Sequence, residues 1–196
     1  MCRKIWKIEN ILTFIEVMIL TVGIKMCFDN IIWGSMICLI FLGILDGLDG
    51  KFAQKVRKNE ENKEYGVQLD SLVDIISSGV FPVIILYSMK FDNMLDVLVY
   101  IIFLICGVTR LAFFNVNNKE NNEYFYGIPI TASAIILPIV YLLTNNEIIY
   151  MVCLFLLSIL YVSKLKIKKL NLKLKIFLSI IGIIVSAFIF IKGGLG

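Results

Sequence analysis

Four aspartates between residues 46 and 74 have the spacing in this sequence that most clearly suggests chemistry. Asp46 and Asp49 are three residues apart, and Asp70 and Asp74 are four apart. On a helix either spacing places both carboxylates on one face, about one turn apart. The mostly polar residues 56–66 predict a connector that folds the chain back and brings the two pairs together. Four carboxylates gathered in this way can bind divalent metal through oxygen; the alternative is two solvated helix ends at a membrane surface.

The bulk composition indicates a membrane protein. The chain has 196 residues, of which 59% are hydrophobic and 17% charged, and its mean hydropathy is +0.89. That is more apolar surface than a soluble domain of this length can bury. Ionisable groups inside hydrophobic spans are costly and usually functional, so this setting favours a site over a solvated surface. The sequence has no histidine, which leaves a carboxylate, lysine, tyrosine or cysteine as any general base.

Long apolar runs predict an all-α integral membrane protein, a bundle of about seven transmembrane helices. Each run approaches the ~20 residues needed to cross the hydrocarbon layer of a bilayer. We interpret the first run as a membrane helix rather than a cleaved signal peptide. We expect a single membrane domain over residues 1–196, with a catalytic core over about 8–145 and extra C-terminal helices over about 147–192. The predicted spans are about 8–28, 31–57, 66–90, 94–116, 127–144, 147–163 and 176–191.

Positive charges predict the orientation of these spans. With the N-terminus in the cytoplasm, sixteen of the nineteen Lys and Arg residues fall on the cytoplasmic side, and only Lys25, Lys90 and Lys192 fall outside. Cytoplasmic loops of membrane proteins carry such an excess of positive charge. We interpret the lysine-rich segment 164–175 as part of this signal and as an attraction to anionic lipid. We therefore expect a multi-pass protein of the cytoplasmic membrane, with the aspartates facing the cytoplasm.

Polar residues also follow one face of the first span. Asn10, Thr13 and Glu16 recur there at helical spacing. Asn10 and Thr13 form either a polar helix entry near the interface or a substrate contact. Glu16 lies deeper in the span, where a carboxylate is harder to explain as an entry residue.

The acidic motif resembles the signature of the CDP-alcohol phosphotransferase family, and other segments resemble its phosphatidylserine synthase branch. The resemblance covers about residues 8–135. Two positions depart from the family pattern, because Gln54 stands where arginine is usual and Glu16 where asparagine is usual. The residues that carry the resemblance are Asp46-x-x-Asp49-Gly50-x-x-Ala53, Gly66-x-x-x-Asp70-x-x-x-Asp74, Leu69-Asp70-Ser71-Leu72, Arg110-Leu111-Ala112, Phe114-Asn115 and Gly127-Ile128-Pro129.

The resemblance implies transfer of a phosphatidyl group from CDP-diacylglycerol to the hydroxyl of L-serine, giving phosphatidylserine and CMP. It implies that Asp46, Asp49, Asp70 and Asp74 hold two divalent ions, Mg²⁺ or Mn²⁺ with Ca²⁺ as a further candidate. Asp74 would also act as the general base toward the incoming hydroxyl. The partners implied are the two substrates, the lipid bilayer and a second copy in a homodimer, and we expect no nucleic-acid partner.

The helix that carries Asp46 is predicted to contribute to binding CDP-diacylglycerol. On a wheel of ~100° per residue, Gly50, Ala53 and Arg57 fall within about 40° of Asp46, so an acid, two small residues and a cation share one stripe. Arg57 either replaces the arginine that is missing at Gln54 or caps the helix end. The resemblance adds Gly66, Asn10 and Thr13 to this binding site.

The acceptor is predicted from a second group of residues. Arg110 can grip the serine carboxylate with two parallel hydrogen bonds, or it can be an interfacial arginine that reaches toward lipid head groups. Asn115 belongs to the same serine-branch segment and is assigned to the serine site with it. One alternative is the same chemistry with glycerol 3-phosphate or inositol phosphate as acceptor. A more distant alternative is a divalent metal transporter whose pore uses the four acids.

Overall fold

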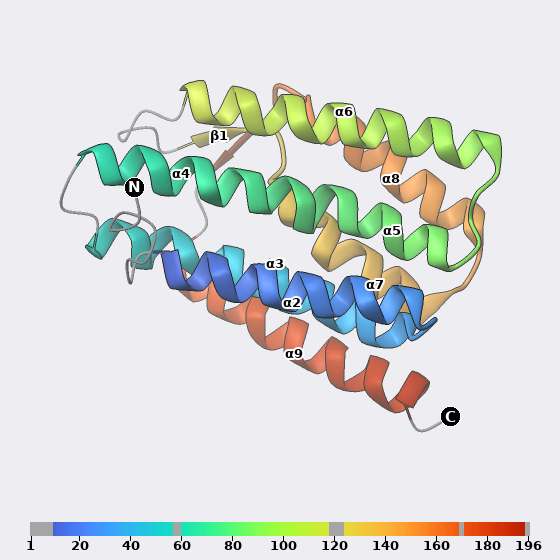
Figure 1. Ribbon diagram of the computed structural model, residues 1–196. Coiled ribbons are helices and arrows are strands. Elements are labelled where there is room, and N and C mark those ends of the chain that lie inside the picture. Colours follow the sequence, from blue (N-terminus) through green and yellow to red (C-terminus); the bar gives the residue numbers. More distant parts are fainter. Residues whose placement is uncertain (1–9, 57–59, 118–123, 169–170, 195–196) are drawn as a thin grey trace.

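The computed structural model describes residues 10–56, 60–117, 124–168 and 171–194. Within these ranges the chain folds into one bundle of helices with a short two-stranded ribbon, and α6 and α9 lie on opposite sides of the bundle (Figure 1). The elements are α2 (Ile11–Phe28), α3 (Ile32–Val56), α4 (Glu60–Asp74), the π-helix η2 (Ile75–Val80), α5 (Phe81–Ser88), α6 (Met94–Asn117), β1 (Tyr124–Tyr126), the 3₁₀-helix η3 (Ile130–Ala132), α7 (Ser133–Leu143), α8 (Glu147–Tyr161), β2 (Lys166–Lys168) and α9 (Leu172–Gly194).

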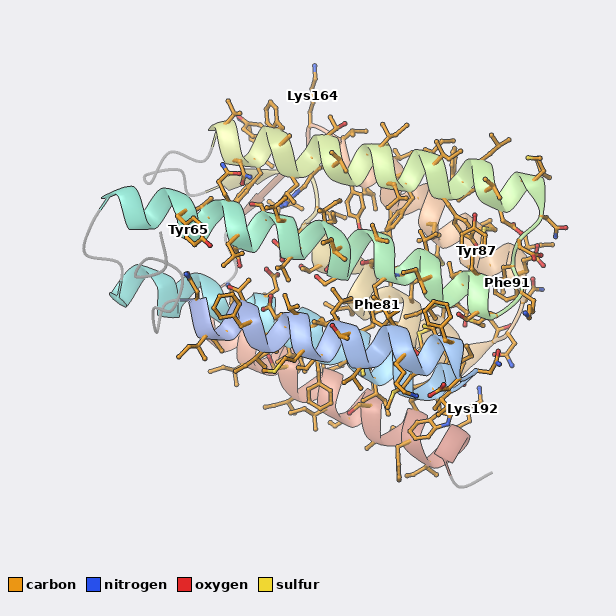
Figure 2. All side chains as sticks on the ribbon, in the orientation of Figure 1. Tyr65, Phe81, Tyr87, Phe91, Lys164 and Lys192 are labelled. Atoms are coloured by element: carbon orange, nitrogen blue, oxygen red, sulfur yellow. The ribbon has the colours of Figure 1, made fainter. Side chains whose placement is uncertain are left out.

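The apolar runs form helices. The length and composition of these helices identify an integral membrane protein. Among the described residues, four helical stretches are long and apolar enough to cross a bilayer, namely Ile11–Phe28, Tyr65–Ser88, Met94–Val116 and Leu174–Gly194. Three shorter apolar helices accompany them, Ile32–Gly47, Ile130–Leu143 and Glu147–Tyr161. Large apolar side chains on the outer faces are exposed (Figure 2), as expected for surfaces that lipid covers.

The core lies where α2, α3, α5 and α7 meet. Met36, Leu39, Phe81, Ile85 and Leu137 have no exposed surface. Helix α9 packs against α3, and α6 packs against α8, so the outer helices hold the central ones in place. Helix α2 packs against both α3 and α4, which fixes the relative positions of the helices that carry Glu16, Asp46 and the pair Asp70 and Asp74.

Two helices begin earlier than the sequence predicted. The third helix was expected from about residue 66, but α4 begins at Glu60, inside the polar connector expected over residues 56–66. The last helix was expected from about residue 176 but begins at Leu172, inside the lysine-rich segment. In both places polar and charged residues extend an apolar helix beyond its hydrophobic stretch, which hydropathy alone does not detect.

A π-helical segment follows Asp74 directly. This irregular stretch is Ile75–Val80, and Pro82 lies in the first turn of α5, where its missing N–H costs little. Pro82 has no N–H to donate to the carbonyl four residues earlier, that of Ser78. That carbonyl accepts a 2.6 Å hydrogen bond from the buried Ser133 hydroxyl of α7. Helix α7 thus holds the segment that follows the second acidic pair.

The loop after α6 and the lysine-rich linker pair as a small antiparallel ribbon, which the sequence analysis did not predict. Tyr124 lies opposite Lys168, and Tyr126 opposite Lys166. Gly127 then turns the chain with φ +72°, and a Cβ there would lie 2.3 Å from the Tyr161 carbonyl oxygen. Only glycine fits this position, for both reasons. The turn leads the chain into η3, the helix that carries Thr131.

Candidate active site

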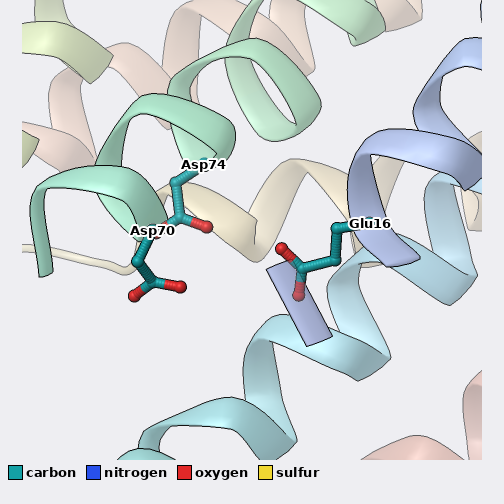
Figure 3. A group of neighbouring side chains, drawn as sticks. All are labelled: Glu16, Asp70 and Asp74. Carbon is teal, nitrogen blue, oxygen red and sulfur yellow. The ribbon is translucent and has the colours of Figure 1, made fainter. Parts of the chain in front are cut away.

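Helices α2 and α4 bring three carboxylates together inside the bundle. Glu16, Asp70 and Asp74 each offer an oxygen, and these three oxygens lie within 4.8 Å of one another (Figure 3). Glu16 is 1% exposed and Asp74 is 8% exposed. Asp70 and Asp74 lie on successive turns of α4, as their spacing predicts. Glu16 was noted in the sequence as a deep acid, but it received no role there.

Asp46 of α3 extends this cluster. Its carboxyl lies within hydrogen-bonding range of the side chains of Asp74 and Thr131, and the charges of Arg110 and Lys175 act on it. Thr131 belongs to η3, the short helix that follows the Gly127 turn. The Ile130 carbonyl in the same helix accepts a 2.8 Å hydrogen bond from the Tyr161 hydroxyl. The Gly127-Ile128-Pro129 segment therefore has a structural explanation, since it places Thr131 beside Asp46.

Arg110 of α6 is a buried cation close to Asp46 and Asp74. It is 8% exposed, and its charge acts on Asp46 and Asp74. The guanidinium lies over the Phe114 ring, 5.0 Å from the ring centroid. Its Nε is buried without a hydrogen-bond partner among the described residues. An arginine that reaches out to lipid head groups would be exposed, so the burial argues against that interpretation.

Asn115 joins α6 to α4 near the second acidic pair. Its amide nitrogen donates a 2.9 Å hydrogen bond to the Ser71 hydroxyl, and that hydroxyl lies 3.2 Å from the Asn115 amide oxygen. Ser71 directly follows Asp70 in the sequence and lies three residues before Asp74. The contact holds α6 against α4, and it brings Arg110 and the acids within reach of one another.

The polar face of α2 points into the protein. Asn10 is 4% exposed and Thr13 is 2% exposed, so neither is a solvated helix entry. Gly66 is also buried, one turn before Asp70 on α4. These three residues are thus buried at the start of α2 and on α4, the helices that carry Glu16, Asp70 and Asp74.

Several predicted site residues lie outside the described residues. Arg57 falls between the described ranges, and only the backbone is described for Asp49, Gly50, Ala53 and Gln54 at the end of α3. Their assignments to metal or to CDP-diacylglycerol remain predictions. Among the first acidic pair, the structure places the side chain of Asp46 alone.

The donor set fits a divalent cation. Carboxylate oxygens are the ligands that Mg²⁺, Mn²⁺ and Ca²⁺ prefer. Asp74 Oδ1 is buried and has no hydrogen-bond partner among the described residues. Buried carboxylates this close repel one another unless a cation or a proton intervenes. Glu16, Asp70 and Asp74 can therefore hold a metal ion, with Asp46 directly beside them.

We expect Glu16→Gln to weaken metal binding. The amide keeps the volume of the side chain but loses the charge and one oxygen ligand. Affinity for Mn²⁺ should fall on the order of tenfold to a hundredfold, the range seen when a partner of a metal ligand is lost. Electron paramagnetic resonance of free Mn²⁺ in titrations of the purified protein measures it. The matched control is Glu147→Gln, since Glu147 accepts a 2.8 Å hydrogen bond from Asn93 in another part of the fold. Unchanged Mn²⁺ affinity in Glu16→Gln would contradict this role.

The comparisons with known proteins define the class. The chain matches the model of the CDP-alcohol phosphatidyltransferase family over residues 6–163, and it belongs to that family. The match covers the four helices that supply the acids and Arg110, and it ends before α9. The predicted family is confirmed.

Several relatives carry more specific names. A CDP-diacylglycerol–serine O-phosphatidyltransferase of Methanocaldococcus jannaschii is 34% identical over 167 residues, which are 82% of this chain and 80% of the relative. A protein of the same name from Helicobacter pylori is 34% identical over 152 residues, 70% of this chain and 63% of the relative. An archaetidylserine synthase of Methanothermobacter thermautotrophicus is 32% identical over 121 residues, 61% of this chain and 51% of the relative. The chain thus spans less than two thirds of the latter two.

Proposed function

We propose that this protein is a CDP-diacylglycerol–serine O-phosphatidyltransferase, which makes phosphatidylserine and CMP. The observation that carries the proposal is the buried group of carboxylates from α2, α3 and α4 with the Arg110 cation beside it. Membership of a transferase family and the names of the relatives support it. A divalent metal transporter has no support in that family match.

In this reaction the substrate serine supplies the nucleophile, and a residue of the chain accepts its proton. The serine hydroxyl oxygen attacks the lipid-linked phosphorus and forms a new P–O bond, while the bond to the CMP oxygen breaks. The hydroxyl proton passes to Asp74, whose buried Oδ1 has no hydrogen-bond partner among the described residues. CMP leaves with the electron pair of the broken bond. A carboxylate held in this way can act as a general base once it lies within hydrogen-bonding distance of the hydroxyl.

The metal ligands are Asp46, Asp49, Asp70 and Asp74 in this proposal, and Glu16 joins them. Two bound ions, Mg²⁺ or Mn²⁺ with Ca²⁺ as a further candidate, would neutralise the diphosphate and stabilise the attacking and leaving oxygens. The close approach of oxygens from α2 and α4 supports the shared use of these acids.

The two substrates are assigned to separate groups of residues. Arg110 would hold the serine carboxylate through its fork of N–H donors, with Asn115 at the same site. For CDP-diacylglycerol we propose contacts on the other helices. These residues are Asn10, Thr13, Gly50, Ala53, Arg57 and Gly66.

We further propose that all seven apolar helices cross the cytoplasmic membrane, with the carboxylates at the cytoplasmic end, where water-soluble serine is available. The charge asymmetry supports this orientation, because Lys25, Lys90 and Lys192 are the cations assigned to the outer side. The core over about 8–145, the added C-terminal helices and a homodimer belong to the same proposal.

Acceptor competition tests the proposed function. Purified protein receives CDP-diacylglycerol, Mn²⁺ and equal concentrations of serine, glycerol 3-phosphate and inositol phosphate, and mass spectrometry identifies the lipid product. We expect phosphatidylserine as the dominant product, because Arg110 matches one carboxylate, whereas a phosphate acceptor favours several cations. A dominant phosphatidylglycerol phosphate or phosphatidylinositol phosphate would assign the protein to the same chemistry with another acceptor.

A further inference from the structure

Helix α9 places a lysine beside the first acidic residue. Lys175 Nζ donates a 2.8 Å hydrogen bond to the Gly47 carbonyl oxygen of α3, and its side chain is half-buried. The Lys175 charge acts on the neighbouring Asp46. The contact joins residues 128 positions apart, through the packing of α9 on α3. Lys175 lies beyond residues 6–163, the range of the family match.

The Lys175 ammonium can bind a further group in addition to the Gly47 carbonyl. A lysine ammonium has three N–H donors, and the Gly47 carbonyl accepts one of them. Gly47 itself faces open space, since a Cβ added there would meet no heavy atom within 4 Å of it. A cation beside open space and next to Asp46 suits an anionic group of a ligand.

We propose that Lys175 contacts the diphosphate of CDP-diacylglycerol, so that α9 completes the nucleotide site. This inference rests on the proposed function for the identity of the substrate. Without the substrate, the hydrogen bond to Gly47 and the charge of Asp46 stabilise the half-buried ammonium. With the diphosphate present, the flexible four-carbon stem lets the ammonium turn toward the phosphate oxygens. In the sequence this lysine belongs to the positive charges that predict topology, because its proximity to Asp46 depends on how α9 packs on α3.

A purely structural tether is the competing explanation, and the same helix offers a control for it. Lys192 also lies on α9 and also donates to backbone carbonyls, those of Tyr141 at 3.1 Å and Leu142 at 3.2 Å. Figure 2 shows Lys192 at the end of the bundle opposite Tyr65, which lies on α4 shortly before Asp70. Lys192→Met therefore removes a comparable tether far from the carboxylates.

The test compares Lys175→Met, Lys175→Gln, Lys175→Arg and Lys192→Met in the full chain. Binding of CDP in the presence of Mn²⁺ is measured by isothermal titration calorimetry in detergent, together with the KM values for both substrates. We expect Lys175→Met and Lys175→Gln to bind CDP about tenfold more weakly, the scale of one lost charged hydrogen bond. The KM for CDP-diacylglycerol should rise in parallel, while the KM for serine stays constant. Lys175→Arg should retain most of the affinity, and Lys192→Met all of it.

Two results would overturn the inference. One is CDP affinity in Lys175→Met equal to that of the wild type. The other is full affinity in Lys175→Gln with a loss in Lys175→Met, because glutamine keeps a donor for the Gly47 carbonyl but carries no charge. Failure of the proposed function would look different, since the wild type would then bind CDP without serine-dependent release of CMP.

Discussion

Asp74→Asn is expected to reduce kcat by about 10² to 10⁴-fold, the range that a positioned general base contributes. The amide keeps the shape of the side chain but cannot take the serine proton. It also removes one of the three carboxylates whose oxygens lie within 4.8 Å of one another. CDP binding in the presence of Mn²⁺ should fall much less than kcat, because Asp70, Glu16 and Asp46 remain. Release of CMP under saturating substrates measures the effect.

Asp96→Asn is the matched control for this prediction. Asp96 is also a buried aspartate, 3% exposed, but its carboxylate accepts a 2.9 Å hydrogen bond from the Asn93 backbone N–H in the turn before α6. Asparagine can still accept that bond, so this variant should keep near wild-type activity. If Asp74→Asn retained more than about a tenth of the wild-type kcat, a loss far below that expected for a general base, Asp74 would not be the base.

Arg110→Lys is expected to raise the KM for serine by about tenfold or more, because lysine cannot form two parallel hydrogen bonds with a carboxylate. The KM for CDP-diacylglycerol should change much less. The guanidinium is buried over Phe114 and faces Asp46 and Asp74, so a bound carboxylate there would lie close to the base. Steady-state kinetics with each substrate varied in turn measures the two KM values.

Serinamide, which lacks the carboxylate, is the chemical control. The wild type should use it poorly, and Arg110→Lys should lower its use little further, since the group that arginine grips is absent. Equal increases in both KM values with serine would contradict the assignment. Arg110 would then belong to the shared part of the site or to the fold.

The all-helical class and the positions of most helices could be predicted from the sequence, because apolar runs of membrane length have few alternatives. The helices α2, α6 and α8 begin and end within about three residues of the prediction. The π-helix after Asp74 could not be predicted. Pro82 leaves the Ser78 carbonyl without a backbone donor, and the hydroxyl of Ser133, which is distant in sequence, donates to it instead. The ribbon of β1 and β2 likewise depends on pairing between distant segments.

The candidate site could be predicted only where its residues are close in sequence. Helical spacing reveals that Asp70 and Asp74 share a face. It cannot reveal that Glu16 approaches them, because that depends on how α2 packs beside α4. Thr131 and Lys175 both interact with Asp46, although they lie 85 and 129 residues further along the chain. Only the recurrence of Asn10, Thr13 and Glu16 on one helical face gave a signal for Glu16.

Serine labelled with ¹⁸O in its hydroxyl group tests the central claim most directly. The wild-type protein is incubated with this serine, CDP-diacylglycerol and Mn²⁺, and mass spectrometry follows the label in both products. Attack by the serine hydroxyl on the lipid-linked phosphorus predicts labelled phosphatidylserine and unlabelled CMP in equal amounts. Release of CMP without phosphatidylserine, or phosphatidylserine that has lost the label, would contradict the proposed transfer.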